Sequence, residues 1–381
     1  MSGFTGAQGR TMGVEEEFLL VDARTARPAP GATAVLRRCG AREPTAQGVG
    51  LKGELFRTQV EAASPVCATA GDLLTALTGA RARLGAAARA EGLRLLATGT
   101  AVLADGPPPL AEGERFAHIA HTYADVVADY QVCGCHVHIG VPDRDTAVAV
   151  VNRLHPWLPV LLALSVNSPY AGGRDRGHAS WRMVEQSRFP GSGVAPRCAG
   201  AADHDARVRA LVECGVLADE HMSFWLARPS GRLPTVEFRV ADTAATAAEA
   251  LLQALLCRAL VDRALTDIAA GLPEPPLDGQ LSAAAVWSAA RYGLSGPAVD
   301  PVTGRRMSAK ARLLDFLSHV APALDAAGDT ERVRTLLDIP TREGTGATRQ
   351  RDAHRSGGPA AVVRFLAHQT DAESSAAGSV F

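Results

Sequence analysis

Lysine is nearly absent from this chain of 381 residues. Only Lys52 and Lys310 occur among 39 basic side chains, and 40 acidic side chains leave a formal net charge of −1. The sequence has no basic block and no interleaving of basic with aromatic residues, so we expect no nucleic-acid surface. The GxxxxGK[ST] pattern of P-loop enzymes is also missing. Any site that handles phosphate must therefore rely on arginine, backbone amides and metal ions.

Paired cysteines and long apolar runs are missing as well. The seven cysteines are scattered and show no CxxC spacing, so neither a zinc ribbon nor a disulfide framework is supported. Cys133 and Cys135 share an expected strand face with Val137 and Ile139, which favours packing in the core. No run of 18 apolar residues occurs, and residues 1–10 lack an apolar secretory segment. We therefore expect a cytoplasmic protein without a membrane span.

The periodicity of apolar residues predicts an α+β fold: a mainly antiparallel sheet backed by long helices, with a helical C-terminal third. We expect a flexible arm (1–10), one catalytic domain (11–370) and a disordered tail (371–381). The expected strands cover residues 12–21, 52–62, 93–98, 131–140 and 233–241, with a weaker candidate at 222–227. The expected helices cover residues 72–92, 143–154, 157–166, 245–270, 282–292, 308–318, 329–338 and 358–368.

Two glutamates separated by one residue lie in the apolar run of residues 13–21. Successive side chains of a strand alternate between its faces, so Glu15 and Glu17 point the same way. Two carboxylates on the inner face of a sheet cost roughly several kcal/mol per ion unless a cation offsets them. The run therefore predicts a strand whose acidic pair has a cationic partner.

Two further strand-like runs repeat this arrangement. His136 and His138 are two residues apart in one run, and Glu237 and Arg239 in the other. Three strands that send polar pairs to one face predict a metal and anion site on a sheet surface. In a phosphoryl-transfer site Glu237 would hold the metal and the planar guanidinium would bridge phosphate oxygens. A simple cross-strand ion pair is the alternative for these two residues.

Glu54 and Glu61 add a third acidic segment. They are seven residues apart, so a regular strand would place them on opposite faces, whereas a bulge or turn near Arg57 would reunite them. Mg²⁺ prefers oxygen ligands in octahedral array, usually few carboxylates plus substrate phosphates. The expected metal ligands are therefore five glutamates and one histidine, namely Glu15, Glu17, Glu54, Glu61, Glu237 and His136.

The two histidines have a second interpretation, because HxH on a strand also opens many amidohydrolase zinc sites. Such sites commonly add a bridging lysine and later His and Asp residues at strand ends. Neither Lys52 nor Lys310 has this context, which disfavours a hydrolase. His138 could also be a hydrogen-bonded structural residue that binds no metal.

Six segments between residues 11 and 368 have an order and spacing that resemble one known family. This family is the carboxylate–amine ligases of the type 2 glutamate–cysteine ligase group. The segments are GVEEEFLLVD (13–22), GCHVHIGVPD (134–143), PWLPVLLALSVNSP (156–169), RPS (228–230), PTVEFRVAD (234–242) and GTGATRQR (344–351).

The resemblance implies a glutamine-synthetase-like fold that binds ATP through two or three Mg²⁺ ions on an antiparallel sheet. It places the six expected ligands on metal-binding or substrate-binding positions. Arg239 falls on an arginine that supports phosphoryl transfer, with His136 as a candidate to assist deprotonation of an amine. Arg182 and Arg228 are candidates for binding a phosphate of the cofactor or a substrate carboxylate, and a surface role is the alternative for each. A homodimer is an open alternative to a monomer.

The function that these residues favour is ATP-dependent γ-glutamyl ligation, in which L-glutamate is joined to an amino-acid acceptor through γ-glutamyl phosphate. The acceptor is cysteine or another small amino acid, including an apolar or unsaturated one. Residues 183–186 read Met-Val-Glu-Gln where the family usually has a more aromatic Ser-Gln-Ile-Trp-like run, which puts the acceptor in question. The alternatives are a metal-dependent hydrolase and a non-catalytic sensor of glutamate or nucleotide.

Overall fold

The computed structural model describes residues 10–40, 48–104 and 106–371. The expected arm and tail lie outside these residues except at their inner ends. Arg10 pairs with Asp262 through an Nε–Oδ1 contact of 2.8 Å, and Asp371 is the last residue of the final helix. The described part of the arm is therefore attached to the body of the molecule.

A seven-stranded antiparallel sheet forms the centre of the molecule. Its strands follow the order β10-β11-β5-β1-β3-β2, and β4 pairs with the second half of β1. The bounds are β1 Met12–Asp22, β2 Gly50–Gly53, β3 Gln59–Ala63, β4 Leu93–Leu96, β5 Gly134–Gly140, β10 Ala227–Pro229 and β11 Thr235–Asp242. Short pairs lie outside this sheet: β6 Tyr170–Ala171 with β7 Arg174–Asp175, β8 Ser192–Gly193 with β9 Phe224–Trp225, and β12 Pro297–Val299 with β13 Arg306–Ser308.

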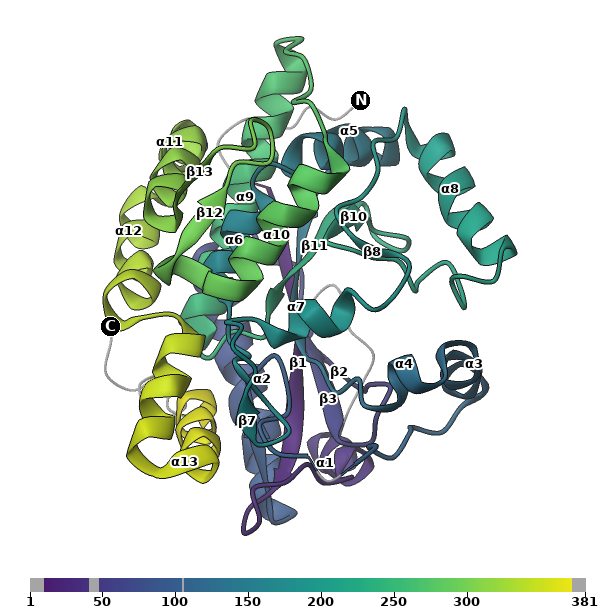
Figure 1. Ribbon diagram of the computed structural model, residues 1–381, viewed down its shortest axis with the longest axis vertical. Helices are drawn as coiled ribbons and strands as arrows, with labels where there is room; N and C mark the ends of the chain where they lie inside the picture. The colour runs from purple at the N-terminus through teal and green to yellow at the C-terminus, as the bar shows by residue number, and fades with distance from the viewer. Residues whose placement is uncertain (1–9, 41–47, 105, 372–381) are drawn as a thin grey trace.

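Helices cover the sheet and make up most of the C-terminal third. Figure 1 shows α10 to α13 on one side of the strands and α3, α4 and α8 on the other. The first helices are α1 Ala32–Cys39, α2 Ala70–Ala90, α3 Glu114–Tyr123, α4 Asp125–Ala128, α5 Arg144–Leu154, α6 Leu158–Ser165, α7 Trp181–Gln186 and α8 Ala201–Glu213. The others are α9 Ala247–Ala269, α10 Gly279–Tyr292, α11 Ala309–Ala327, α12 Thr330–Asp338 and α13 Gly346–Asp371, with short helical turns at Gly293–Ser295 and Ile339–Glu343. The α+β prediction is confirmed.

The two faces of the sheet differ in what covers them. One face carries Val14, Val137 and Phe238 and packs against α9, α5 and α6 in the largest apolar cluster. On the other face, α13 covers only the end formed by β4 and the second half of β1. The first half of β1 and the middle of β5 and β11 are therefore left for polar side chains on that face.

The glutamate triplet of β1 shows this division directly. Glu16 points to the helical face, where it is 1% exposed and receives Nε and Nη2 of Arg81 at 3.0 and 2.6 Å. Glu15 and Glu17 point to the opposite face, as the alternation of a strand requires. A fixed ion pair thus neutralises the middle glutamate and leaves the outer two for the candidate site.

Most predicted elements form within a few residues of their expected bounds. The strand expected at 52–62 is wrong as a single strand, because β2 and β3 are the two arms of a hairpin with a turn at Arg57 and Thr58. The helix expected at 308–318 continues to Ala327 across Pro322, and the one expected at 358–368 begins at Gly346 and breaks at Gly357–Gly358. The sequence interpretation missed α1, α3, α4, α7 and α8.

The two neighbouring cysteines are both fully buried, as expected, but they do not share one environment. Cys135 packs in the main cluster with Val137. Cys133 precedes β5 and packs with Leu19 in the cluster beneath α13. Among the described residues no single helix is long and apolar enough to cross a membrane, and only the bent pair α5–α6 passes that test jointly.

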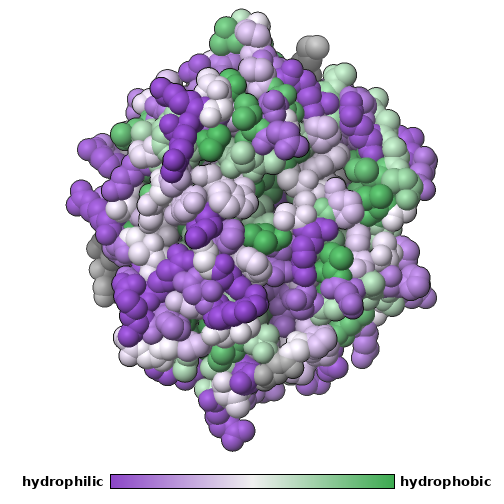
Figure 2. All heavy atoms as spheres, viewed as in Figure 1, coloured by the Kyte–Doolittle hydropathy of each residue, from purple (hydrophilic) through white to green (hydrophobic). Residues whose placement is uncertain are grey.

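Hydrophilic and hydrophobic side chains are interspersed over the face of the molecule seen in Figure 2. Five large hydrophobic side chains in the described part of the chain are strongly exposed. Of these, Val66 and Leu233 border a cavity at the start of β1, and Trp287 borders another beside α10.

Candidate active site

Strand register brings the polar pairs predicted from sequence onto one face. Antiparallel pairing sets Glu17 opposite Glu61 across β1 and β3, and Glu237 opposite His138 across β11 and β5. Directly opposite residues of antiparallel strands have Cβ atoms about 5 Å apart. The face therefore holds two acidic groups side by side.

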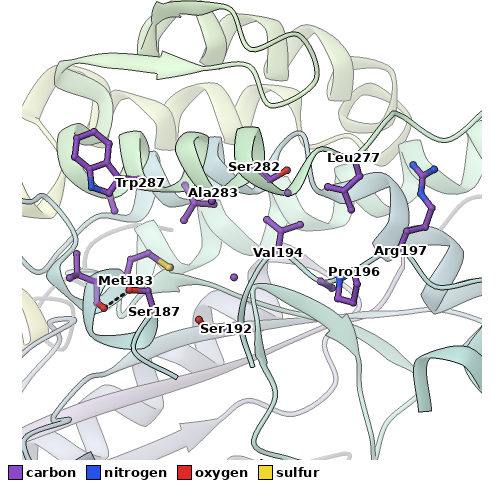
Figure 3. A pocket seen from close by; sticks show the side chains of 16 residues that line it. Met183, Ser187, Ser192, Val194, Pro196, Arg197, Leu277, Ser282, Ala283 and Trp287 are labelled. Carbon is purple, nitrogen blue, oxygen red and sulfur yellow. Dashed lines mark hydrogen bonds between the residues drawn. The ribbon is translucent and has the colours of Figure 1, made fainter. Parts of the chain in front are cut away.

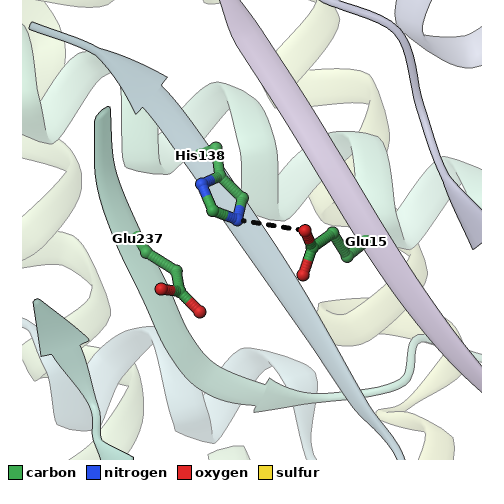
Figure 4. A group of neighbouring side chains, drawn as sticks. All are labelled: Glu15, His138 and Glu237. Atoms are coloured by element: carbon green, nitrogen blue, oxygen red, sulfur yellow. Dashed lines mark ion pairs between the residues drawn. The ribbon is translucent and has the colours of Figure 1, made fainter. Parts of the chain in front are cut away.

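Glu15, His138 and Glu237 form the first acidic group (Figure 4). One ligand atom from each lies within 4.8 Å of the others. His138 Nδ1 contacts Thr235 Oγ1 at 3.0 Å, while its buried Nε2 has no hydrogen-bond partner and lies 3.6 Å from Glu15 Oε1. A buried nitrogen lone pair or N–H without a partner is costly, and a divalent cation between two carboxylates would satisfy a neutral imidazole here.

Glu17, Glu54 and Glu61 form the second acidic group, again with ligand oxygens within 4.8 Å of one another. The hairpin turn between β2 and β3 carries Glu54 back to Glu61, so the predicted turn near Arg57 is confirmed. Burial raises the pKa of all three carboxyls, and mutual repulsion adds to the shift at Glu54 and Glu61. A bound cation would remove this repulsion, so an oxygen-rich cation site fits the residues present.

Two arginines hold Glu237 in place. Arg228 approaches it with Nε at 2.8 Å and Nη2 at 3.3 Å, and Arg239 Nη1 donates to its Oε1. Burial opposes ionisation, but Arg239 and Arg228 together keep the pKa of Glu237 far below its usual range. Glu237 is therefore ionised and fixed in the position from which it reaches His138.

His136 lies between the two acidic groups and belongs to neither. Its Nδ1 is 3.4 Å from Glu15 Oε2 and 3.5 Å from Arg239 Nη1, and its Nε2 is 3.8 Å from Glu17 Oε1. Burial and the neighbouring Arg239 lower the pKa of His136 to about 4, so the ring is neutral at pH 7. The sequence interpretation placed His136 among the metal ligands and His138 outside them; the structure groups His138, and not His136, with two carboxylates.

Arg182 reaches the same face from α7. Its Nη2 donates to the carbonyl of Arg239 at 3.1 Å, while Nε and Nη1 are buried without a hydrogen-bond partner. Asp242, 3.9 Å from Nη1, is held by the hydroxyls of Ser168 and Ser180. A Cβ on Gly134 would lie 2.4 Å from Arg182 Nη2, so the glycine makes room for the guanidinium. Arg182 thus has donors to spare for an anionic ligand.

One cavity adjoins the first acidic group, another lies beside α7, and a third, of about 470 Å³, borders Arg228. The first of these has about 430 Å³, with Glu15, His138 and Thr235 in its wall beside the apolar side chains of Val66 and Leu233. Its volume falls in the range of ordinary small-molecule sites. It is therefore the cavity from which a ligand would reach Glu15 and His138.

The largest of the three has about 750 Å³ and lies between α7 and α10, as Figure 3 shows. Met183 and Val184 line it together with Trp287, but no member of either acidic group does. Residues 183–186, where the sequence departs from the family, therefore do not all line this cavity. The side-chain amide of Gln186 instead donates to the carbonyl of Phe224 at 3.1 Å. Arg182, on the same short helix, faces the acidic groups instead.

Two residues beside the site were not found from the sequence, and a third was not included among the expected ligands. Asp242 was not considered, and Lys52 was set aside although its Nζ lies 2.9 Å from Glu61 Oε1. His138 was placed on the site face, with a metal-free structural role left open. The signal for Lys52 was present, because a hairpin centred near Arg57 places residues 52 and 61 opposite each other. His138 and Asp242 could be assigned only once strand register was known.

Comparison with known proteins identifies the family of the chain. The family model described as glutamate-cysteine ligase family 2 matches residues 11–371. A protein of Saccharopolyspora erythraea that bears the name glutamate–cysteine ligase 2-2 is 52% identical over 362 residues, which cover 95% of this chain and 93% of the relative.

Solved structures share the fold at low sequence identity. The glutamate–cysteine ligase of Francisella tularensis, solved in complex with AMP, aligns with a TM-score of 0.68 at 13% identity, covering 96% of this chain and 89% of its own. A bifunctional glutathione synthetase of Pasteurella multocida aligns with a TM-score of 0.66 at 15% identity, covering 96% of this chain and 53% of its own. On its sequence match and on this fold, the chain belongs to glutamate–cysteine ligase family 2 and is an ATP-dependent carboxylate–amine ligase.

Proposed function

We propose that the enzyme joins the γ-carboxyl group of L-glutamate to the amino group of a small amino acid at the expense of ATP. A γ-carboxylate oxygen attacks the terminal phosphorus of ATP, and ADP leaves. The acceptor nitrogen then attacks the acyl carbon of γ-glutamyl phosphate, phosphate leaves, and the nitrogen gives up its proton. The products are a γ-glutamyl amide, ADP and phosphate.

The observation that carries this proposal is the pair of acidic groups on one sheet face with Arg239 beside them. Arg239 Nη1 contacts Glu237 of the first group, and its charge acts on Glu17 of the second. A guanidinium between two cation sites is suited to the charge that develops on a transferring phosphoryl group. Two-metal sites also occur in hydrolases, so it is the family match, and not the doubled arrangement, that favours phosphoryl transfer over hydrolysis.

Both acidic groups fit Mg²⁺, because their donors are mainly carboxylate oxygens and one imidazole nitrogen. Glu15, His138 and Glu237 would hold one ion and Glu17, Glu54 and Glu61 another. Bound Mg²⁺ would neutralise phosphate charge and orient the reacting oxygens. The protein's own contribution is to fix these carboxylates on adjacent strands, with Glu237 clamped by two arginines.

Substrates can be assigned to regions of this face by charge. The cavity of about 430 Å³ has an apolar wall for a nucleotide base and ends at Glu15 and His138, so we place ATP there. Arg182 offers two buried and unpartnered N–H groups near Glu17, which suits a carboxylate of glutamate. Arg228 is fully engaged with Glu237 and two backbone carbonyls, so we assign it to positioning Glu237 rather than to direct binding.

His136 is our candidate for the proton transfer that accompanies amine attack. It is neutral, lies between the two acidic groups, and has Glu15 within 3.4 Å. A neutral imidazole can accept a proton from an attacking amine, and the adjacent carboxylate stabilises the imidazolium that results. Because the pKa of His136 is low, its ring would carry the proton only during amine attack and would be neutral before and after it.

The acceptor is cysteine or another small amino acid, including an apolar or unsaturated one. The substituted segment at 183–186 supports an acceptor other than cysteine, because Met183 and Val184 change the wall of a cavity beside the helix that carries Arg182. A pocket that separates small apolar side chains by shape alone discriminates only about 10–200-fold. Several acceptors should therefore be turned over at measurable rates.

The test is incubation of purified protein with Mg²⁺, ATP, glutamate and a panel of single amino acids, with ADP and γ-glutamyl product both measured. ADP release that requires glutamate and an acceptor supports the ligase. Cleavage of an amide without ATP would instead indicate the hydrolase, and binding of glutamate or nucleotide without turnover would indicate the sensor. Either of these results would overturn the proposed reaction.

A further inference from the structure

The two edge strands of the sheet each place one cation opposite the outermost glutamate. At one edge Arg228 on β10 is paired with Glu237 on β11. At the other edge Lys52 on β2 is paired with Glu61 on β3. Each acidic group therefore ends in a basic residue that lies on its own face and outside the set of candidate ligands.

The two cations hold their carboxylates in different ways. Arg228 contacts both oxygens of Glu237 and also donates to backbone carbonyls, with a side chain that is only 14% exposed. Lys52 makes one contact, 2.9 Å from its Nζ to Glu61 Oε1, and its side chain is 46% exposed. A guanidinium fork fixes a carboxylate, whereas an ammonium on a flexible stem can leave it.

Lys52 is also the one strong base in ion-pair contact with the second acidic group among the described residues. Glu61 pairs with Lys52. Glu17 accepts a hydrogen bond from the backbone N–H of Gly134 at 2.6 Å and has His136 Nε2 at 3.8 Å, but it contacts no lysine or arginine in the described part of the chain, and neither does Glu54. Three buried carboxylates with one ammonium remain a strongly anionic set. An ammonium and a divalent cation would compete for the same oxygen of Glu61, because both need it as their nearest negative charge.

We propose that Lys52 is a resident counter-ion of the Glu17–Glu54–Glu61 group, and that a divalent metal enters this group by displacing the ammonium from Glu61. The inference rests on the proposed metal-binding role of that group. Lys52 thereby sets the metal affinity of the second group without being a ligand itself. Lysine at position 52 suits this role, because an ammonium on a flexible stem can leave a carboxylate more readily than a guanidinium fork can.

The test is a titration of the nucleotide-free enzyme with Mn²⁺. Binding is measured by isothermal titration calorimetry and, independently, by the paramagnetic resonance signal of free Mn²⁺. Lys52→Met removes the competing charge and should raise the affinity of one Mn²⁺ site roughly tenfold or more, where tenfold is about 1.4 kcal/mol. Lys52→Arg keeps the charge but adds a fork, so it should weaken that site relative to wild type. The affinity of the other site should change little in both variants.

The chain supplies its own matched control, because Lys310 is the only other lysine and is exposed at the start of α11, away from both acidic groups. Lys310→Met should bind Mn²⁺ as the wild type does. If Lys52→Met and Lys310→Met bind alike, or if Lys52→Arg binds as tightly as Lys52→Met, Lys52 does not compete with the metal and the inference fails. If wild type binds no divalent ion, the proposed metal site fails as well, so the two failures are distinguishable.

Thermal melts of the metal-free variants guard against loss of folding. Lys52→Met leaves three carboxylates without their ammonium, so its melting temperature without metal should be lower than that of Lys310→Met. The deficit should shrink when Mn²⁺ is added, because the metal then takes over the charge that the ammonium supplied. A deficit that persists at saturating Mn²⁺ would show that Lys52 is a structural ion pair, and this result also overturns the inference. Lys52→Arg retains the charge and keeps the comparison valid if the methionine variant does not fold.

Discussion

Replacement of Arg239 by lysine separates charge from geometry at the proposed phosphoryl-transfer site. In the structure Arg239 Nη1 donates to Glu237, its Nε is buried without a partner, and its guanidinium carbon lies 5.9 Å from the ring centre of Phe224. Lysine keeps one positive charge and one contact to Glu237. It loses the fork that can bridge two phosphate oxygens and leaves the space of Nε empty.

The expected magnitude follows from the number of donors that are lost. Removal of one preorganised donor to a developing negative charge typically lowers kcat about 100–1000-fold, or roughly 3–4 kcal/mol. Because the interaction is made mainly in the transition state, kcat and kcat/KM should fall together, and KM for ATP should change little. Folding should be largely preserved, since Arg228 still contacts both oxygens of Glu237 at 2.8 and 3.3 Å.

The assay is steady-state ADP release at saturating glutamate and acceptor, with ATP varied, alongside a thermal melt of each variant. Arg263→Lys is the matched control, because Arg263 pairs with Asp267 within α9 and touches neither acidic group. Normal kcat with a raised KM for ATP would mean that Arg239 only binds the ground state. Such a result would refute the reasoning that assigns Arg239 to the transition state.

Three further outcomes are expected. Glu15→Gln and Glu237→Gln should each abolish ligation and weaken Mn²⁺ binding at the first group, and wild-type turnover at saturating Mg²⁺ would contradict this. Glu15→Gln should leave stability nearly unchanged because it removes a charge from an anionic cluster, whereas Glu237→Gln should stay folded with a lower melting temperature because Arg228 and Arg239 lose their shared carboxylate. His138→Gln should reduce Mn²⁺ affinity at least tenfold, and more than His136→Gln does; the reverse order, measured by calorimetry, would return His136 to the ligand set. When acceptors compete at equal concentrations, kcat/KM for cysteine should not exceed that of every other acceptor by more than about tenfold, or about 1.4 kcal/mol. Restoring Ser-Gln-Ile-Trp at residues 183–186 should shift the preference toward cysteine. A larger preference for cysteine in the unmodified enzyme would contradict the hypothesis.

The elements that could be predicted from sequence are those with a strong local signal. β5 alternates polar and apolar residues, β1 is a long apolar run interrupted by three glutamates, and α9 has a continuous apolar stripe that packs on the sheet. The hairpin of β2 and β3 was read as one strand because the connection at residues 54–58 contains Leu55 and Phe56 and no glycine. α8 was missed because its apolar face is narrow: Val208 is buried, Leu211 and Val212 are only partly buried, and about half of the helix is charged or polar.

The candidate site divides in the same way. The alternation rule was enough to place Glu15 and Glu17 on one face, because that relation lies within one strand. It also placed His136 and His138 together, but it could not say which of them would meet Glu237. That choice depends on the register between β5 and β11, which sets Glu237 opposite His138. Register is a property of two distant segments and has no signature in either one.

Acceptor choice is the property that local sequence signals describe least, and the position of α7 explains why. Arg182 faces the acidic groups, whereas Met183, the next residue, lines the cavity between α7 and α10. A substitution at residue 183 can therefore act by reshaping the cavity or by moving the helix that carries Arg182. The first route would change the ratio of kcat/KM between acceptors, because only side-chain contacts differ. The second would lower kcat/KM for every acceptor by a similar factor, since Arg182 is assigned to glutamate, the substrate that all of these reactions share.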